Sequence, residues 1–218
     1  MSRRRTIDIV VSNAYAANRR RKRYRRRLRR TRAAVLVVTE SSWVGRLRGY
    51  RRHGAPGGVH ARDCAIYVRR GIRVDHTAAR TLTRDVGGYA HARTVVEVRL
   101  RYRGQRWAVF AVHANPGRKG RAAEQNARLL RGVRAQMEAA RRDGYEPAAL
   151  GDWNRRATET GPDTPATLAR RLGGVCRLVN IDGVVTTARV LWLRSRGRPP
   201  GADHPLIRTR LSAREVKR

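Results

Sequence analysis

The sequence predicts an α/β protein in which β-sheets pack face to face and helices cover their outer faces. Short apolar runs of strand length recur along the chain, often in pairs, whereas few segments have helical periodicity. Hydrophobic residues make up 40% of the 218 residues, which is enough to build a real core. A chain of this length suits one large domain better than two. Paired strands with few helices are typical of stacked sheets flanked by helices.

Strands are expected wherever a short apolar run is bounded by turn or loop residues. These runs cover residues 6–12, 34–39, 64–69, 93–100, 106–112, 146–150, 181–187, 189–194 and 206–211. The sequence RYRG at 101–104 indicates a hairpin turn between two of them. Residues 45–62, which are rich in glycine and arginine, and residues 195–205 are expected to be loops.

A long amphipathic helix is predicted over residues 121–142. Gly144 follows it at the position where a C-cap glycine is expected. Its apolar stripe consists of Ala123, Ala127, Leu130, Val133, Met137 and Ala140. Residues 155–170 contain one glycine and two prolines, and we expect a loop or a short helix there.

A strongly basic helix or arm is predicted at residues 18–32, within a single domain that spans residues 1–218. Residues 18–30 contain ten basic residues in thirteen. Ala17, Tyr24 and Leu28 recur at helical spacing, so one narrow apolar face can dock on a core. The alternative is a disordered basic arm. We favour the helix, because strands that are predicted to be buried lie on both sides of it.

The charge of the chain is strongly unbalanced, with 51 basic and 16 acidic residues and a formal net charge of +35. Such a charge attracts polyanions at long range, so nucleic acid is the expected partner, with DNA ahead of RNA. An anionic membrane surface comes second, and no protein partner is indicated. Only Lys22, Lys119 and Lys217 are lysines, a bias that a GC-rich genome can explain. Coding bias does not explain the excess of basic over acidic residues.

Cysteine usage indicates a reducing, intracellular compartment, cytoplasmic or nucleic-acid-associated. Cys64 and Cys176 are the only cysteines, and two distant cysteines make neither a disulfide framework nor a zinc site. The N-terminus resembles an export signal, but its apolar region is short and interrupted by Asp8, Ser12 and Asn13, so we reject that interpretation. No apolar run reaches transmembrane length, and stable membrane insertion is not expected.

Polar residues recur at the ends of the apolar runs. They are Asn13, Glu40, His113, Asp152 with Asn154, Asp182, and Asp203 with His204. Taken singly, each fits an ordinary structural role, such as a helix cap for Asn13 or a satisfied core histidine for His113. Taken together, they form an ordered pattern.

That pattern resembles the endonuclease/exonuclease/phosphatase superfamily, which includes deoxyribonuclease I-like enzymes and abasic-site endonucleases. After Asn13 and Glu40 come HANP at 113–116, GDWN at 151–154, ID at 181–182 and ADH at 202–204. The resemblance runs from about residue 6 to residue 211. It implies a four-layer α/β sandwich of two packed mixed β-sheets flanked by helices.

The resemblance also implies a divalent metal. Glu40 matches the main magnesium ligand, with Asn13 beside it and Asp203 as the late aspartate that helps to hold the ion. Magnesium binds oxygen ligands, so these side chains suit it better than imidazole does. Mg²⁺ is therefore the expected cofactor, with Mn²⁺ as a substitute.

The remaining positions match catalytic roles. His204 matches the histidine at the scissile phosphate, and Asp182 the carboxylate that orients it. Asp152 and Asn154 match the pair that position the attacking water and a phosphate oxygen. His113 matches the other histidine that contacts the phosphate.

Two further expectations concern neighbours of these residues. Some members of the superfamily pair the first histidine with a glutamate from a preceding strand, and Glu97 is the nearest candidate here, in a strand of undetermined register. Nucleic-acid contacts are expected from Arg19, Arg23, Arg26, Arg30, Asn115 and Arg118.

The predicted function is a divalent-metal-dependent phosphodiesterase, a nuclease that hydrolyses a DNA or RNA backbone. Phosphodiester hydrolysis needs an aimed water, a neutralised phosphate and an assisted leaving group, which these residue types can supply. One alternative is a non-catalytic basic protein that binds nucleic acid on a nuclease fold, although the acidic and histidine positions are all present. Another is a phosphatase or lipid phosphodiesterase of the same superfamily, although no exposed apolar insertion loop is evident.

Overall fold

The computed structural model describes residues 5–14, 20–54, 64–86, 91–117, 119–156, 159, 161–197, 199 and 204–213. Within them, two six-stranded sheets form the centre of the molecule. The first sheet has the strand order β11 (Arg189–Ser195), β12 (Ile207–Ser212), β1 (Thr6–Asn13), β2 (Val35–Thr39), β4 (Cys64–Arg69) and β3 (Tyr50–Gly54). The second has the order β5 (Arg73–Thr81), β6 (Thr94–Tyr102), β7 (Gln105–His113), β8 (Glu146–Asp152), β10 (Asp182–Thr186) and β9 (Val175–Val179).

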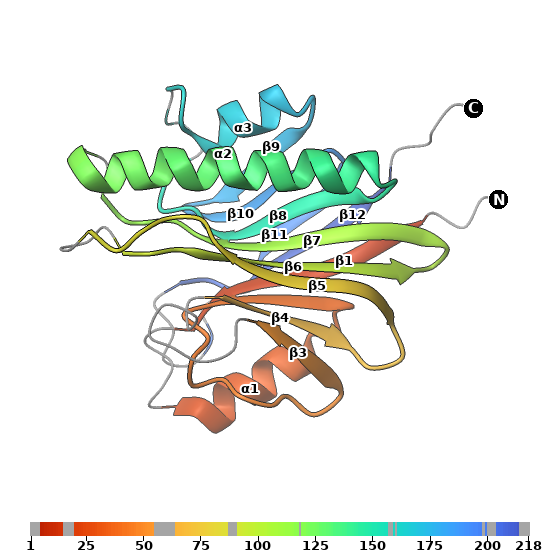
Figure 1. The fold of residues 1–218 in the computed structure, drawn as a ribbon. Coiled ribbons are helices and arrows are strands. Elements are labelled where there is room, and N and C mark those ends of the chain that lie inside the picture. The colour runs from red at the N-terminus through yellow and green to blue at the C-terminus, as the bar shows by residue number, and fades with distance from the viewer. Residues whose placement is uncertain are drawn as a thin grey trace.

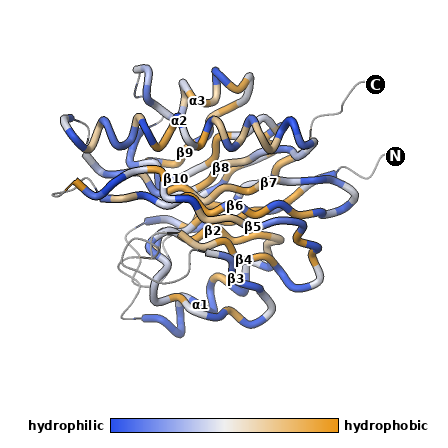
Figure 2. The backbone as a smooth tube through the Cα atoms, viewed as in Figure 1, coloured by the Kyte–Doolittle hydropathy of each residue, from blue (hydrophilic) through white to orange (hydrophobic). Residues whose placement is uncertain are grey.

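The sheets and helices form four layers, which confirms the predicted α/β sandwich (Figure 1). Helix α1 (Arg21–Arg30) covers the outer face of the first sheet. Helices α2 (Gly120–Arg142) and α3 (Pro165–Arg171) cover the outer face of the second. Hydrophobic residues gather in the two sheets and hydrophilic ones on the outside (Figure 2).

Strand β1 shows why the sheets need cover on both faces. Ile7, Ile9 and Val11 are fully buried and pack with residues of the second sheet. Val10, which points to the opposite face, belongs to the cluster beneath α1 that includes Tyr24. Burying both faces of a strand removes the usual apolar and polar alternation, and this explains the nearly continuous apolar run in the sequence.

The basic segment between β1 and β2 is helical over Arg21–Arg30. Tyr24 and Leu28 are fully buried, and the Tyr24 hydroxyl donates to Ser12 Oγ at 2.9 Å. Full burial of such an apolar side chain contributes roughly 1.5–3 kcal/mol. This anchoring holds the narrow apolar face of the helix against the first sheet and leaves most of its arginines exposed to solvent.

Two βαβ units determine where polar side chains can meet. The pairs β1–β2 and β7–β8 are parallel, joined through α1 and α2, and every other pairing among the described strands is antiparallel. The carboxyl ends of parallel strands lie at one edge of a sheet, where ligands bind in open α/β sheets. Asn13 therefore pairs with Thr39, next to Glu40, and His113 pairs with Asp152.

Three strands were not predicted. β3 lies within residues 45–62, which we expected to be a loop, and β5 and β9 have no counterpart among the predicted strands. Each is the last strand at one side of its sheet, and most of its side chains are exposed or only partly buried. Edge strands need little apolar sequence, so the hydrophobic pattern that reveals a central strand is missing. No helix among the described residues is both long and apolar enough to cross a membrane.

Candidate active site

The candidate site lies where the carboxyl ends of the two parallel pairs meet. Asn13 ends β1 in the first sheet, and Asp152 ends β8 in the second. Asn13 Nδ2 donates to Asp152 Oδ2 at 3.1 Å and to Glu40 Oε1 at 3.3 Å, which links the two sheets. Asp182 begins β10 opposite Asp152 in the antiparallel register, so a second carboxylate from the same sheet arrives beside the first.

Gly151 allows Asp152 to reach this position. A Cβ atom at residue 151 would lie 1.8 Å from the carbonyl oxygen of Val112 in the neighbouring strand β7, and the backbone φ is 151°. Only glycine lets the two backbones approach this closely. The glycine of GDWN is therefore a packing requirement that places the aspartate after it.

We expect Gly151→Ala to destabilise the fold severely, by more than about 2 kcal/mol, because backbone must move to remove the clash. Urea unfolding followed by circular dichroism measures the change. Gly104→Ala is the matched control. Its φ is 73° and nothing lies within 4 Å of an added Cβ, so only the left-handed backbone costs energy, about 1 kcal/mol. Equal losses in the two variants would contradict the packing argument.

Asp152 is the centre of the polar cluster. Its Oδ1 accepts from the Asn154 backbone N–H at 2.9 Å. Its Oδ2 lies 3.7 Å from His204 Nδ1 and 4.0 Å from His113 Nε2, in addition to the bond from Asn13. Asn154 has a left-handed φ of 48° and donates its side-chain amide to Ala114 O at 2.7 Å, so the turn after β8 is held to β7. One carboxylate thus faces both histidines.

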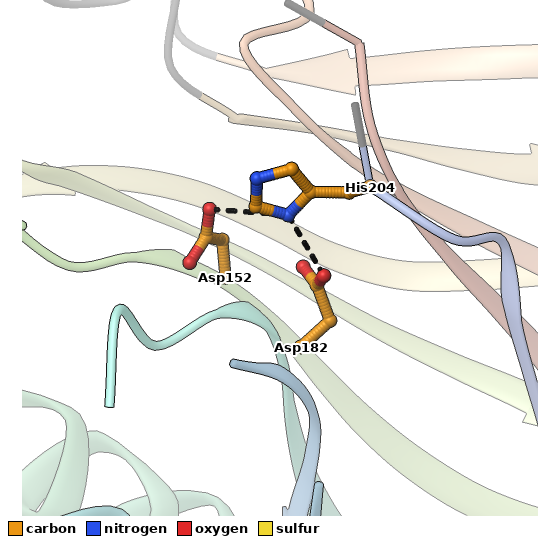
Figure 3. A group of neighbouring side chains, drawn as sticks. All are labelled: Asp152, Asp182 and His204. Atoms are coloured by element: carbon orange, nitrogen blue, oxygen red, sulfur yellow. Dashed lines mark hydrogen bonds and ion pairs between the residues drawn. The ribbon is translucent and has the colours of Figure 1, made fainter. Parts of the chain in front are cut away.

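The buried Asp182 and the partly buried His204 form a pair beside Asp152 (Figure 3). His204 Nδ1 lies 2.8 Å from Asp182 Oδ2. Burial raises the pKa of Asp182 to about 6, an effect that the hydrogen bond with His204 opposes and the charge of Asp152 reinforces. The other carboxylate oxygen, Oδ1, is buried without a hydrogen-bond partner in the described part of the chain.

This donor set fits a divalent metal. One ligand atom each from Asp152, Asp182 and His204 lies within 4.8 Å of the others. A buried carboxylate oxygen without a partner is costly, and a cation or a polar substrate group beside it relieves that cost.

Glu40 is the carboxylate of the cluster that solvent reaches most easily. Its side chain is 28% exposed, against 3% for Asp152. Its φ of 51° is in the left-handed region, which is strained for a residue that is not glycine. Glu40 Oε1 lies 3.8 Å from His113 Nε2. Strain of this kind is characteristic of functional positions, where the surroundings impose a particular side-chain direction.

Arg93, which the sequence analysis did not single out, holds His113 from behind. The arginine is 5% exposed and its Nη1 lies 3.1 Å from His113 Nδ1. A guanidinium only donates hydrogen bonds, so Nδ1 must accept and the neutral ring must carry its proton on Nε2. That proton points toward Glu40 and Asp152. Glu97, the candidate partner of His113 in the sequence, instead accepts from Arg99 Nε at 2.5 Å.

Removing the contact between Arg93 and His113 is expected to let the His113 ring exchange between its two neutral tautomers. In Arg93→Met, Nδ1 loses its donor, so ¹⁵N NMR of the imidazole nitrogens should show a mixture of tautomers. Turnover should fall by about 10–100-fold, as for other residues that orient a ligand or catalytic histidine. Arg93→Lys retains a donor and should preserve the Nε2–H form. Arg80→Met, at an exposed position of β5, is the control. An unchanged imidazole spectrum in Arg93→Met would rule out this role.

Asn115 proves to be part of the same support. It is fully buried, and its Oδ1 accepts from Arg93 Nε at 2.8 Å and from the His91 backbone N–H at 3.1 Å. Its backbone is bridged on both sides by the side chain of Asn126. The geometry supports a structural role for Asn115, in place of the expected contact with nucleic acid.

The structure brings together seven of the side chains singled out in the sequence. They are Asn13, Glu40, His113, Asp152, Asn154, Asp182 and His204. Asp203, Arg19 and Arg118 lie outside the described residues. Arg93 carried no signal in the sequence, since an arginine before an apolar run does not stand out in so basic a chain.

No family model matches the sequence, and no curated protein matches it. Solved structures do match. One is the crystal structure of D. rerio TDP2 complexed with single strand DNA product, which is 14% identical in sequence to this chain. The match has a TM-score of 0.70 and covers 95% of this chain and 99% of that one. The chain has the endonuclease/exonuclease/phosphatase fold.

Two Bacteroides thetaiotaomicron proteins support this assignment of the endonuclease/exonuclease/phosphatase fold. An endonuclease/exonuclease/phosphatase family protein is 13% identical, with a TM-score of 0.69 over 96% of this chain and 95% of its own. The mannosyl-6-phosphatase Bt3783 is 12% identical, with a TM-score of 0.69 over 94% of this chain and 99% of its own. The structural resemblance implied by the sequence pattern is confirmed over nearly the whole chain. At these identities the likeness concerns the fold and not the substrate.

Proposed function

We propose that the protein is a divalent-metal-dependent phosphodiesterase that hydrolyses the backbone of nucleic acid. The observation that carries the proposal is the meeting of Glu40, Asp152 and Asp182 with two histidines at one edge of the sandwich. The chain has only 16 acidic residues against 51 basic ones, so concentrating three carboxylates at one place needs a reason. Binding a cation that meets a phosphate is such a reason.

Glu40, Asn13 and Asp203 are the residues that we assign to Mg²⁺, with Asp152 adjacent. The cluster of Asp152, Asp182 and His204 is the competing position, but His204 Nδ1 is already occupied by Asp182, and magnesium prefers oxygen donors. When bound, the ion supplies charge neutralisation at the phosphate and lowers the pKa of water.

The protein side chains then have separate tasks. Asp152 is placed to accept the proton of the attacking water, and Asn154 holds the turn that carries it. His113 can donate its Nε2 proton to a phosphate oxygen. His204, whose ring is fixed by Asp182, faces the same space and can stabilise the charge that develops on the phosphoryl oxygens.

The surface charge supports a polymeric substrate. The relative with mannosyl-6-phosphatase activity in its name means that the fold alone does not choose between monoesters and polymers. The TDP2 relative was solved with a single strand DNA product, so a backbone of this shape can accept DNA. A net charge of +35 is more than one small phosphate ester requires, and it favours nucleic acid.

One experiment tests the proposal directly. The pure protein is incubated with supercoiled plasmid, linear duplex, abasic duplex, single-stranded DNA, RNA and mannose 6-phosphate, with Mg²⁺, with Mn²⁺ or with chelator. We expect metal-dependent cleavage of at least one nucleic acid and its loss with chelator. Release of phosphate from the sugar alone would identify a monoesterase. Tight binding to nucleic acid without any cleavage would identify a non-catalytic binding protein.

The exposed arginines of α1 are expected to bind phosphates without reading bases. Replacing Arg23, Arg26 and Arg30 with glutamine should weaken binding to all sequences alike and flatten its salt dependence, by a log–log slope of up to roughly 0.9 for each phosphate contact on duplex DNA. Turnover at saturating substrate should be unchanged. Fluorescence anisotropy between low and high salt measures the slope.

The matched control removes the same charge from α2, on the opposite outer face, by replacing Arg128, Arg131 and Arg142 with glutamine. If both triple variants lower the slope equally, net charge and not α1 is responsible. Thermal unfolding is followed alongside, because arginine stems also cover apolar surface.

A further inference from the structure

A groove lined by arginine side chains opens beside the edge strand β3, away from the candidate active site. Its volume is about 860 Å³. Its arginines, all exposed, are Arg46, Arg48, Arg51, Arg52 and Arg70. Leu47 and Tyr50, which are 3% and 7% exposed, complete its lining. We call this feature the β3 groove.

No carboxylate among the described residues neutralises the charge of the β3 groove. No acidic residue lines it, and none of its arginines forms an ion pair with a carboxylate of the described residues. Some arginines elsewhere do have carboxylate partners: Arg73 and Arg101 share Asp75, and other arginines share Asp8. The β3 groove instead gathers five guanidinium groups around one concavity, none of them paired with a carboxylate among the described residues.

The position of the groove relates it to the candidate site. Backbone bonds from Arg69 to Ala34 O and from Arg70 to Gly49 O place it at the amino end of β2. Glu40 follows the carboxyl end of the same strand. At roughly 3.3 Å per residue, the five residues of β2 alone account for about 17 Å between the two, and the full separation is larger because β4 lies between β2 and β3.

The basic surface continues between these two places. Helix α1 lies next to strand β3, the edge strand of the first sheet, at the bottom of the molecule in Figure 1. Arg25 of α1 donates to Trp43 O at 3.1 Å, which ties the helix to the loop that leads into the groove. A nucleic-acid strand that runs from the candidate active site along α1 would reach the β3 groove next.

We propose that the β3 groove is an exosite for the sugar–phosphate backbone of nucleic acid, several nucleotides away from the phosphate that is cleaved. Guanidinium groups bind phosphate oxygens in pairs of parallel hydrogen bonds, so arginine suits this ligand. The aromatic ring in the lining is not free to stack on a base, because Tyr50 is buried and its hydroxyl donates to Ala33 O at 2.9 Å. The groove thus offers guanidinium contacts to phosphates and no aromatic surface on which a base can stack.

The nature of the ligand of this exosite rests on the proposed function. The exosite makes the affinity of the protein for nucleic acid depend on the length of the substrate. A separation of more than about 17 Å corresponds to more than roughly 5 base pairs, at 3.4 Å of axis per base pair. Duplexes shorter than this should reach the active site or the groove but not both. Longer duplexes should gain phosphate contacts.

The test variant replaces Arg46, Arg48, Arg51 and Arg70 with glutamine. Arg52 is kept because its guanidinium contacts Tyr67 and lies close to Gly54, so its loss would disturb β3. The matched control replaces Arg128, Arg131, Arg142 and Arg171, exposed residues of α2 and α3, and lowers the net charge equally. Circular dichroism confirms that both variants fold.

Binding is measured by anisotropy with chelator present, using labelled hairpins with stems of about 4 and about 20 base pairs at several salt concentrations. For the long stem, the groove variant should lose roughly 2–4 units of log–log salt slope, about 0.9 for each lost contact. The short stem, which can still bind at the active site, should lose clearly less salt slope than the long stem, and the control should change little with either. Equal effects of groove and control variants, or equal losses on both stems, would overturn the exosite.

Cleavage separates this proposal from the function on which it rests. With metal present, the groove variant should raise KM for long duplexes and leave kcat unchanged. If the protein cleaves nothing but the length-dependent loss of binding is found, the exosite stands and the nuclease proposal fails. If it cleaves long and short substrates and the groove variant behaves as the control, the nuclease proposal stands and the exosite fails.

Discussion

Glu40→Gln should retain the fold and lose at least about 100-fold in turnover, because it removes the negative charge that we assign to the metal. The substitution preserves the size of the side chain and a hydrogen-bonding oxygen for Asn13. Glu40 is also the most exposed carboxylate of the cluster, so its replacement does not leave a cavity. Metal affinity, measured with Mn²⁺ by electron paramagnetic resonance, should fall together with activity.

His204→Ala distinguishes the two possible metal positions. If the ion is held at Glu40, Asn13 and Asp203, Mn²⁺ should still bind to His204→Ala while catalysis is lost. If Asp152, Asp182 and His204 hold it, His204→Ala should weaken Mn²⁺ binding more than Glu40→Gln does. Glu138→Gln is the control for charge, since Glu138 lies on α2 and pairs only with Arg134 among the described residues. Full metal binding and activity in Glu40→Gln would reject our assignment.

His204 and Asp182 should behave as one catalytic unit. Each of His204→Ala and Asp182→Asn is expected to lower kcat by about 10²–10⁴-fold, the range for positioned acid–base groups. The double variant should be little worse than the worse single one, because the 2.8 Å contact makes each residue depend on the other. Losses that simply multiply would mean that the two residues act independently.

Asp182→Asn also tests the raised pKa. The carboxyl group has a pKa of about 6 in the folded protein, against an ordinary value of 3.8, so it keeps its proton up to a higher pH in the folded than in the unfolded state. Its contribution to the free energy of unfolding is therefore present below about pH 4 and is lost as pH rises through about 6. Urea unfolding without metal at the two ends of this range should show a fall in the original protein that is smaller in Asp182→Asn.

The sequence was sufficient for the central strands and for the order of the polar residues. Central strands are buried on both faces, so Val35–Thr39 and the neighbouring strands consist of apolar runs in the sequence. The polar residue that follows each run marks the carboxyl end of the strand. Edge strands such as β5 have no such constraint and were missed. The bond between Arg93 and His113 was also beyond reach, because it depends on which side chains face each other across two strands.

The two βαβ units also make catalysis a late product of folding. Asn13, Glu40 and His204 lie in or beside strands of the first sheet, whereas His113, Asp152 and Asp182 lie in the second. A nascent or half-unfolded chain with one sheet formed has the whole positive charge but only half of the reactive groups. If the proposed function holds, such a chain would bind nucleic acid but would not cleave it. A refolding experiment should therefore show DNA binding before the first cleavage, with activity appearing only as the two sheets dock.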